Sequence, residues 1–270
     1  MNSPIRLIAI DLDGTLFTSQ QQVSPASRAA LRQALDAGIQ IVLASGRGIS
    51  GVERTLDLLE MDLPYISSAG AAIFPGKQGQ VISARTFHVR AELDLVIDFA
   101  RQTGAGLVAD LPRGMLWYGP DDLLDRLDAF TAASMRNSLR TVDPVKDFDQ
   151  PIFKMSLAGG PGLLNDAAEV LAKCPSLHSI YAGIQYVDIT ARGVDKGSAL
   201  RIFAGQAGMA PAEIAAIGDQ PIDLPMFEYA GLAIAMGNAP AAVQQAANWV
   251  APSNDEDGLA WSLTRILAQT

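Results

Sequence analysis

Several apolar segments of this chain end abruptly in acidic, hydroxyl-bearing or small residues, and this repeated pattern constrains the fold more than any other feature. Residues 5–10 lead into Asp11, and residues 39–44 lead into Ser45. The same change follows two later segments, residues 214–217 and 232–236. A strand covered on both faces of a parallel sheet is apolar along its whole length. The pattern predicts buried parallel strands with polar residues at their carboxyl ends.

Helical signals between these segments predict how the strands are connected. Ser24 and Pro25 suit the start of a helix, Leu31 and Leu35 recur at helical spacing, and Gly38 suits its end. Strand, helix and strand in this order form a βαβ unit. We therefore predict an α/β fold with a doubly wound, parallel, Rossmann-like sheet and right-handed crossovers. Strand ends from both ends of the chain would then meet at one edge of the sheet.

Asp11 and Asp13 follow the first predicted strand and have only Leu12 between them. Gly14 permits the tight turn that brings backbone close to a ligand. Two carboxylates ~4 Å apart repel by about 4 kcal/mol at an effective dielectric constant near 20. A divalent cation would neutralise them, and a site made of oxygen ligands indicates Mg²⁺.

Residues 83–190 have a different pattern, and we predict that they form an α+β domain inserted into a core of residues 1–82 and 191–270. The length of 270 residues is close to the size at which one core splits into two domains.

Within the insertion, residues 91–101 have a helical pattern, and a second helix is expected from Gly160 to about Lys173. Residues 153–157 alternate apolar and polar side chains, which is typical of a strand with one solvated face. A strand pair across residues 178–189 would close the insertion.

Composition excludes several classes of protein. The net charge of −9 argues against a nucleic-acid partner, and no apolar run approaches the ~20 residues of a membrane span. The single cysteine, Cys174, excludes an internal disulfide. Because the start lacks a secretory signal pattern, we expect a cytoplasmic protein. We also expect a monomer or a weak homo-oligomer.

Four motifs occur in a fixed order: Asp11-Leu12-Asp13-Gly14-Thr15, Ser45-Gly46-Arg47, Gly193-Val194-Asp195-Lys196-Gly197, and Gly218-Asp219 with Asp223. Together they resemble the haloacid dehalogenase-like hydrolases, and most closely the Cof-type, type II capped sugar phosphatases. Residues 228–231, 235–239 and 253–258 agree further with this family. The resemblance covers both ends of the chain and is weakest through the insertion.

The resemblance implies a mechanism for hydrolysis of a phosphomonoester. Asp11 is similar to the family's nucleophile, which forms an aspartyl phosphate. Asp13 is similar to the general acid and base, which protonates the leaving oxygen and later activates water. Lys196 would contribute a positive charge to the reaction and to phosphate binding.

The resemblance also implies the ligands of the metal and of the phosphate. Mg²⁺ would bind Asp11, the backbone carbonyl of Asp13, and Asp219. Asp223 is either a further ligand or a residue that supports the site. The phosphoryl group would contact Ser45, Gly46, Arg47 and Lys196.

Each of these residues has a simpler alternative role. The paired acids would be turn or cap residues, Ser45 a helix cap, Arg47 part of a surface ion pair, and Lys196 a solvated side chain. His88 and His178 lie outside every motif, which argues against a histidine-based site. Trp117 and Tyr118 would form either a substrate wall or, more often for aromatic residues on a strand, part of the core.

The chain departs from the Cof-type pattern at two positions. Ala69 and Ile222 stand where this family usually has asparagine. Loss of one polar contact of this kind costs about 1.5–3 kcal/mol when a charged group is involved. We therefore expect activity that is reduced or shifted in substrate.

Three functional hypotheses follow. The first is a magnesium-dependent phosphatase for a small phosphorylated metabolite such as a sugar phosphate. The second is a catalytically weak sensor that binds such a metabolite, and the third is a phosphoaspartate receiver-like switch. The resemblance implies that the insertion is a cap that determines substrate choice, with hinges near Gly79 and Gly193.

Overall fold

The computed structural model describes residues 4–77, 79–87, 89–112, 114–120, 122–123, 139–140, 143–148, 150–181 and 185–269. The chain divides into two compact units. The first comprises Met1–Gly46, Val52–Ser83 and Asp195–Thr270, and the second comprises Arg47–Gly51 and Ala84–Val194. The short segment Arg47–Gly51 therefore groups with the second unit.

The described part of the first unit is built on an eight-stranded sheet with the order β14-β13-β12-β1-β2-β3-β4-β5. In this order, each strand from β14 to β3 pairs in parallel with its neighbour, and β4 pairs with β3 in the antiparallel direction. This arrangement confirms the predicted parallel core. The strands are β1 (Leu7–Ile10), β2 (Gln40–Ala44), β3 (Tyr65–Ser67), β4 (Ala72–Phe74), β5 (Ser83–Ala84), β12 (Ile214–Gly218), β13 (Leu232–Ala235) and β14 (Trp249–Val250).

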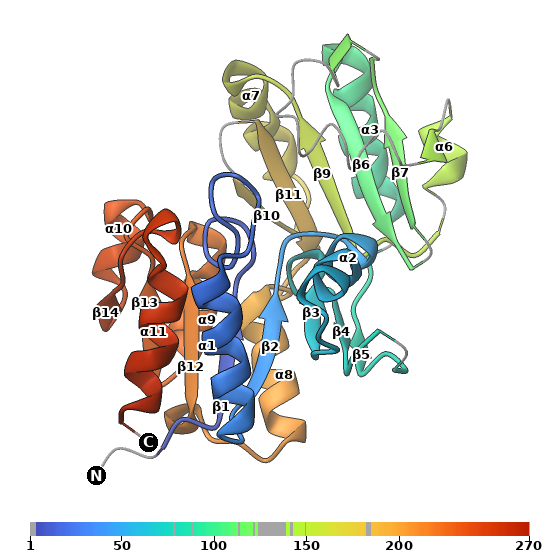
Figure 1. The fold of residues 1–270 in the computed structure, drawn as a ribbon. Helices are drawn as coiled ribbons and strands as arrows, with labels where there is room; N and C mark the ends of the chain where they lie inside the picture. Colours follow the sequence, from blue (N-terminus) through green and yellow to red (C-terminus); the bar gives the residue numbers. More distant parts are fainter. Residues whose placement is uncertain are drawn as a thin grey trace. The chain divides into compact units, whose positions relative to one another are not determined.

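Helices cover both faces of this sheet, as a doubly wound fold requires (Figure 1). Helices α1 (Pro25–Asp36) and α11 (Gly258–Leu267) pack together on one face, and α8 (Lys196–Gln206) packs with α9 (Leu224–Tyr229). The remaining helices of at least one turn are α2 (Ile49–Leu59) and α10 (Ala241–Gln245).

Local sequence signals explain where α1 begins and which face of it is buried. Ser24 has an extended backbone, and its hydroxyl accepts a hydrogen bond from the backbone N–H of Ser27 at 3.0 Å. Pro25 follows at the first helical position, which suits its fixed φ and missing N–H. The predicted Leu31 is buried, whereas Leu35 is only half-buried.

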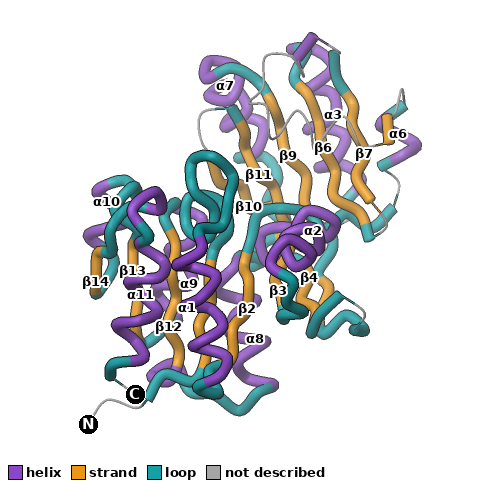
Figure 2. The backbone as a smooth tube through the Cα atoms, viewed as in Figure 1, coloured by secondary structure: helices purple, strands orange, loops and turns teal. Residues whose placement is uncertain are grey.

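The described part of the second unit is built on a mostly antiparallel sheet with the order β10-β11-β9-β6-β7-β8. Helices α3 (Arg90–Thr103) and α7 (Pro161–Leu171) lie behind its strands in Figure 2 and share an apolar core with them. A short helix, α6 (Pro144–Asp147), contacts α3. The strands are β6 (Gly106–Leu111), β7 (Gly114–Tyr118), β8 (Leu139–Arg140), β9 (Lys154–Ala158), β10 (Leu177–Tyr181) and β11 (Tyr186–Ala191).

The expectation of a solvated face on the strand at residues 153–157 is wrong. Every residue of β9 is buried, including Lys154 and Ser156. Both polar side chains donate hydrogen bonds to the buried carboxylate of Asp188 on β11. The alternating polar and apolar residues therefore lie on opposite faces of this strand, but both faces are buried.

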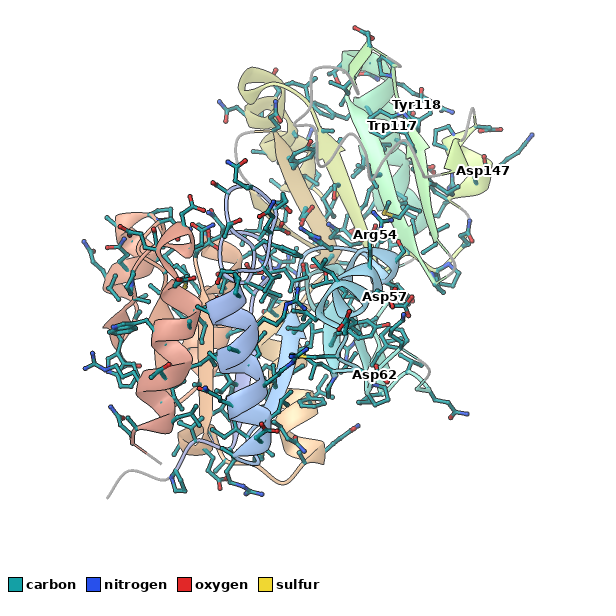
Figure 3. All side chains as sticks on the ribbon, in the orientation of Figure 1. Arg54, Asp57, Asp62, Trp117, Tyr118 and Asp147 are labelled. Atoms are coloured by element: carbon teal, nitrogen blue, oxygen red, sulfur yellow. The ribbon has the colours of Figure 1, made fainter. Side chains whose placement is uncertain are left out.

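One other expectation, which concerns the aromatic residues Trp117 and Tyr118 of β7, has a clear outcome. Trp117 is buried in one apolar cluster with Val108 and Leu123, which supports a core role for it, and Tyr118 next to it is half-buried. Figure 3 labels both aromatic side chains. Cys174 is buried in the apolar core of the second unit. None of the helices in the described ranges is both long and apolar enough to cross a membrane.

Candidate active site

The predicted functional residues of the first unit gather because their strands are neighbours. Strand β1 pairs in parallel with both β12 and β2, and Ile10 is in register with Ile217 and with Leu43. Asp11 follows β1 and Ser45 follows β2. Because parallel strands end at the same edge, the residues that follow them form one group at the carboxyl edge of the sheet.

Lys196 forms the centre of a buried ion cluster. Its Nζ donates to Asp11 Oδ1 at 2.5 Å and to Asp223 Oδ1 at 2.6 Å. The side chain is only 1% exposed, so the alternative of a solvated Lys196 is wrong. Hydrogen bonds between buried charged groups are short and strong, and they fix both carboxylates relative to the amine.

The start of α8 positions Lys196. Asp195 precedes the helix in an extended conformation, and its side chain accepts a hydrogen bond from the backbone N–H of Ser198 at 2.6 Å. The hydroxyl of Ser198 accepts in return from the backbone N–H of Asp195 at 3.0 Å. This reciprocal cap holds the first turn, so the lysine leaves the helix in a fixed direction.

The charges in the cluster shift the acidity of its members. Burial tends to lower the pKa of Lys196, but Asp11 and Asp223 oppose this effect and the net pKa is raised, so the amine stays protonated. Burial raises the pKa of Asp11, Lys196 opposes this, and the nearby carboxylates raise the pKa further. The cluster therefore has more carboxylates than one lysine can neutralise.

Asp223 supports the site through both of its carboxylate oxygens. Oδ2 accepts hydrogen bonds from the backbone N–H groups of Asp219 and Gln220, each at 3.0 Å, while Oδ1 accepts from Lys196. The side chain is fully buried. Gly218 makes this approach possible, since a Cβ atom there would overlap the Asp223 carboxylate. Asp223 therefore fixes the backbone that presents Asp219.

Asp219 accepts hydrogen bonds from neutral donors on both oxygens. Thr15 Oγ1 donates to Oδ1 at 3.2 Å, and Gln220 Nε2 donates to Oδ2 at 2.9 Å. Burial, followed by the charge of Asp223, raises the pKa of Asp219 to about 6. Thr15 and Gln220 were not selected from the sequence as contributors to the site, although each lies close to an acid that was selected.

Three carboxylates form a group that could hold a cation. Oxygen atoms of Asp11, Asp219 and Asp223 lie within 4.8 Å of one another. A set of oxygen donors in a buried, negatively charged site fits Mg²⁺. The side chain of Asp13 is half-buried and is not part of this group of carboxylates.

The expected phosphate-binding residues are divided between the two units. Ser45 is buried, its backbone N–H donates to the Ile66 carbonyl at 2.9 Å, and its carbonyl accepts from Ala69 N–H at 3.0 Å. Gly46 is the last residue of its segment in the first unit, and Arg47 groups with the second. Because α2 starts at Ile49, Ser45 does not cap that helix.

The two positions that depart from the family pattern differ in structure. Ala69 is buried in a short turn after β3 and has a left-handed backbone, with φ 57° and ψ 29°. Asparagine tolerates this conformation better than alanine does. Ile222 belongs to the 3₁₀ turn Pro221–Asp223. Of the two histidines, His178 is exposed on β10 and His88 lies outside the described residues.

A family model described as haloacid dehalogenase-like hydrolase matches residues 8–263. The chain belongs to this family. A Bacillus subtilis protein named 5-amino-6-(5-phospho-D-ribitylamino)uracil phosphatase YwtE is 28% identical to this chain, over 98% of this chain and 99% of its own length. Phosphatase YwpJ from the same organism is also 28% identical, over 97% of this chain and 100% of its own.

Solved structures agree with this assignment. A haloacid dehalogenase-like hydrolase from Bacteroides thetaiotaomicron has a TM-score of 0.85 and 27% identity, covering 97% of this chain and 99% of its own. A second structure, described as a subclass IIB sugar phosphatase, has the same TM-score at 23% identity and supports the fold. The protein is a phosphoric monoester hydrolase of this family, and the comparisons favour this hypothesis over the sensor and the receiver-like switch.

Proposed function

We propose that the protein hydrolyses a small phosphorylated metabolite with the help of Mg²⁺, through a phosphorylated Asp11. The observation that carries this proposal is the buried cluster in which Lys196 contacts Asp11 and Asp223 while Asp219 completes a group of three carboxylates. Mg²⁺ held by Asp11, Asp219 and the Asp13 carbonyl, with support from Asp223, would neutralise charge on the phosphoryl oxygens.

In the first step, a carboxylate oxygen of Asp11 bonds to phosphorus while the bond from phosphorus to the ester oxygen breaks. Asp13 gives its proton to that oxygen, so the alcohol leaves in neutral form. Lys196 stays protonated because of the charge of its partners, and it offers hydrogen bonds to the phosphoryl oxygens as negative charge develops there.

In the second step, Asp13 accepts a proton from water while the water oxygen bonds to phosphorus. The bond between phosphorus and Asp11 then breaks, which releases inorganic phosphate and restores the Asp11 carboxylate. Ser45, Gly46 and Arg47 are proposed to hold the phosphoryl group in both steps. Ser45 is suited to this role because its backbone is fixed by hydrogen bonds to the neighbouring strand and turn.

The substrate class is proposed from the relatives. The names of two B. subtilis relatives specify 5-amino-6-(5-phospho-D-ribitylamino)uracil, a phosphorylated polyol that carries a ring. This compound and a set of sugar phosphates are therefore the first substrates to test. Because Ala69 and Ile222 lack the usual amides, we expect the preferred ester to differ from that of a typical Cof-type enzyme.

A phosphate-release assay tests the proposal. The purified protein is assayed with this set of esters in the presence of Mg²⁺ or EDTA. The control variants are Asp11→Asn, which removes the nucleophile, and Asp36→Asn at an exposed helix end. We expect release that requires Mg²⁺, is lost in the first variant and is retained in the second. Release from no ester above the level of Asp11→Asn would contradict the proposal.

A second assay tests the covalent intermediate. An aryl phosphate needs little acid catalysis in the first step because its leaving group is stable as an anion. In Asp13→Asn the first step should then proceed while hydrolysis is slow. Intact-mass measurement after acid quench should show one added phosphoryl group, and the double variant with Asp11→Asn should show none. Absence of the adduct despite a burst of the aryl alcohol would exclude this pathway.

A further inference from the structure

Two C-terminal segments have no role in the proposed chemistry, yet they contact the acidic loops directly. Asn238 follows β13, and its Nδ2 donates to the Gly14 carbonyl at 2.9 Å and to Asp219 Oδ2 at 3.3 Å. We propose that Asn238 is a positioning residue that holds these two loops in register, and that the backbone N–H of Asn254 keeps its amide in the required orientation. This inference rests on the proposed function, because it concerns the same carboxylates.

A single amide group can join the loops because they pass very close to each other. Gly14 has a φ of 81°, and a Cβ atom at this position would overlap the Asp219 carboxylate. The loop after β1 and the loop after β12 are therefore packed backbone against side chain at this point. The two hydrogens of the Asn238 amide are divided between them, one for each loop.

The contact completes a set of neutral donors around Asp219. Thr15 occupies Oδ1, and Gln220 and Asn238 share Oδ2. Neutral donors fix the orientation of the carboxylate without cancelling its charge, so its attraction for a cation is retained. Such partners of metal-binding groups typically change metal affinity by about 10–100-fold when they are removed.

Asn254 determines which way the Asn238 amide faces. Its backbone N–H donates to Asn238 Oδ1 at 3.0 Å. If the amide were rotated by half a turn, its oxygen would face the Gly14 carbonyl and Asp219, and its NH₂ group would face another N–H donor. One backbone donor therefore selects the orientation that binds both acidic loops.

The same C-terminal segment contacts the loop after β1 at two further points. Asn254 Nδ2 donates to the Phe17 carbonyl at 2.9 Å, and Asp255 Oδ1 accepts from the Ser19 backbone N–H at 2.8 Å. These bonds join residues more than two hundred positions apart in the sequence. They give a structural role to Asn254 and Asp255, which take no part in the proposed reaction.

Asn238→Ala tests the positioning role, and Gln244→Ala is its matched control. Gln244 Nε2 donates to the carbonyls of Gly237 and Ala239, so it holds the same turn without contacting Asp219. The Mg²⁺ dissociation constant is measured by titration calorimetry without substrate, alongside kcat, KM and Tm. Asn238→Ala should weaken Mg²⁺ binding roughly tenfold with little change in Tm, because the side chain is exposed. Gln244→Ala should leave Mg²⁺ binding within about threefold of the unsubstituted protein.

Two substitutions at one position separate the backbone contribution of Asn254 from that of its side chain. Asn254→Ala loses only the bond to Phe17, whereas Asn254→Pro also loses the N–H that orients Asn238. Proline suits this site, because it is the first residue of the 3₁₀ turn Asn254–Glu256 and Ser253 before it is extended, with ψ 165°. Asn254→Pro should therefore weaken Mg²⁺ binding more than Asn254→Ala does.

A double-mutant comparison completes the test. If Asn254 acts through Asn238, Asn254→Pro and Asn254→Ala should have the same Mg²⁺ affinity once each is combined with Asn238→Ala. The inference is overturned if Asn238→Ala binds Mg²⁺ as Gln244→Ala does, or if the two single Asn254 variants are equal. A protein that binds Mg²⁺ with these differences but hydrolyses no ester would contradict the proposed function and leave the positioning role supported.

Discussion

Each unit of the protein buries one lysine beside two aspartates, and the two clusters are built in different ways. In the first unit, Lys196 contacts Asp11 and Asp223 at 2.5 and 2.6 Å. In the second unit, Lys154 lies 3.1 Å from Asp188 and 3.9 Å from Asp110. The same residue types therefore occur in both units, but only the first cluster lies among the loops at the carboxyl edge of a parallel sheet.

The difference comes from the position of the residues on their elements. Lys154 lies directly opposite Asp110 in the antiparallel pair of β9 and β6, so regular strand pairing brings them together. Asp11, Lys196 and Asp223 come from a strand end, a helix start and a 3₁₀ turn. Residues on loops can present carboxylates to a ligand, whereas residues in mid-strand are committed to neighbours in the sheet. A buried lysine with two aspartates is therefore not sufficient to indicate an active site.

Lys196→Met should produce the largest effect in this comparison. The substitution leaves Asp11 and Asp223 buried without their cation, which costs about 3–5 kcal/mol of unfolding free energy. Phosphatase activity should fall below detection. Urea unfolding and phosphate release measure both, with Lys173→Met at an exposed position as the control. Normal stability in Lys196→Met would contradict the ion cluster described for the first unit.

Lys154→Met should be less harmful. Asp188 would retain the hydrogen bond that Ser156 donates at 2.6 Å, so we expect a loss of about 1–3 kcal/mol. Hydrolysis of a small aryl phosphate should stay within about tenfold of the unsubstituted protein. If Lys154→Met abolished this activity as fully as Lys196→Met does, the functional distinction between the two clusters would be wrong.

The raised pKa of Asp219 predicts how the stability of the metal-free protein depends on pH. In the folded protein the pKa of Asp219 is about 6, above its ordinary value of 3.8. Such an acid contributes to stability at pH values at which it is protonated in both the folded and the unfolded protein. This contribution is present below about pH 4 and is lost as the pH rises through 6.

Urea unfolding in EDTA between pH 4 and pH 7 measures this effect. The unsubstituted protein should lose up to about 2–3 kcal/mol relative to Asp219→Asn as the pH rises. Equal slopes for the two proteins would show that Asp219 has an ordinary pKa.

Ala69→Gly should give the smallest effect, and it should be stabilising. Ala69 has a φ of 57°, where a Cβ atom costs about 1 kcal/mol, and glycine removes this strain. The greater freedom of glycine in the unfolded chain offsets part of the gain. Ala71→Gly is the control, because Ala71 has an ordinary φ of −72° and the substitution should only destabilise. Thermal unfolding of the two variants should therefore shift in opposite directions.

The sequence was sufficient to predict β1, β2, β12 and β13 of the first unit and the polar residues that follow them. Residues 39–44 and 214–217 were predicted as strands, and β2 and β12 span Gln40–Ala44 and Ile214–Gly218. The reason is local: continuous apolar character reports burial on both faces, and a polar residue after it marks the strand end. Asp11 and Asp219 were selected on this basis together with the family motifs, whereas Lys196 at the start of α8 was selected from a family motif alone.

Tertiary structure alone decided which distant groups share a hydrogen bond. The alternation at residues 153–157 predicted a solvated face, but Asp188 on another strand allows Lys154 and Ser156 to be buried. Asn238 belonged to a recognised motif, but nothing local in the sequence indicates that its amide joins Gly14 to Asp219. Periodicity indicates which residues share a face of an element, whereas the choice of partner depends on packing between elements that are far apart in the chain.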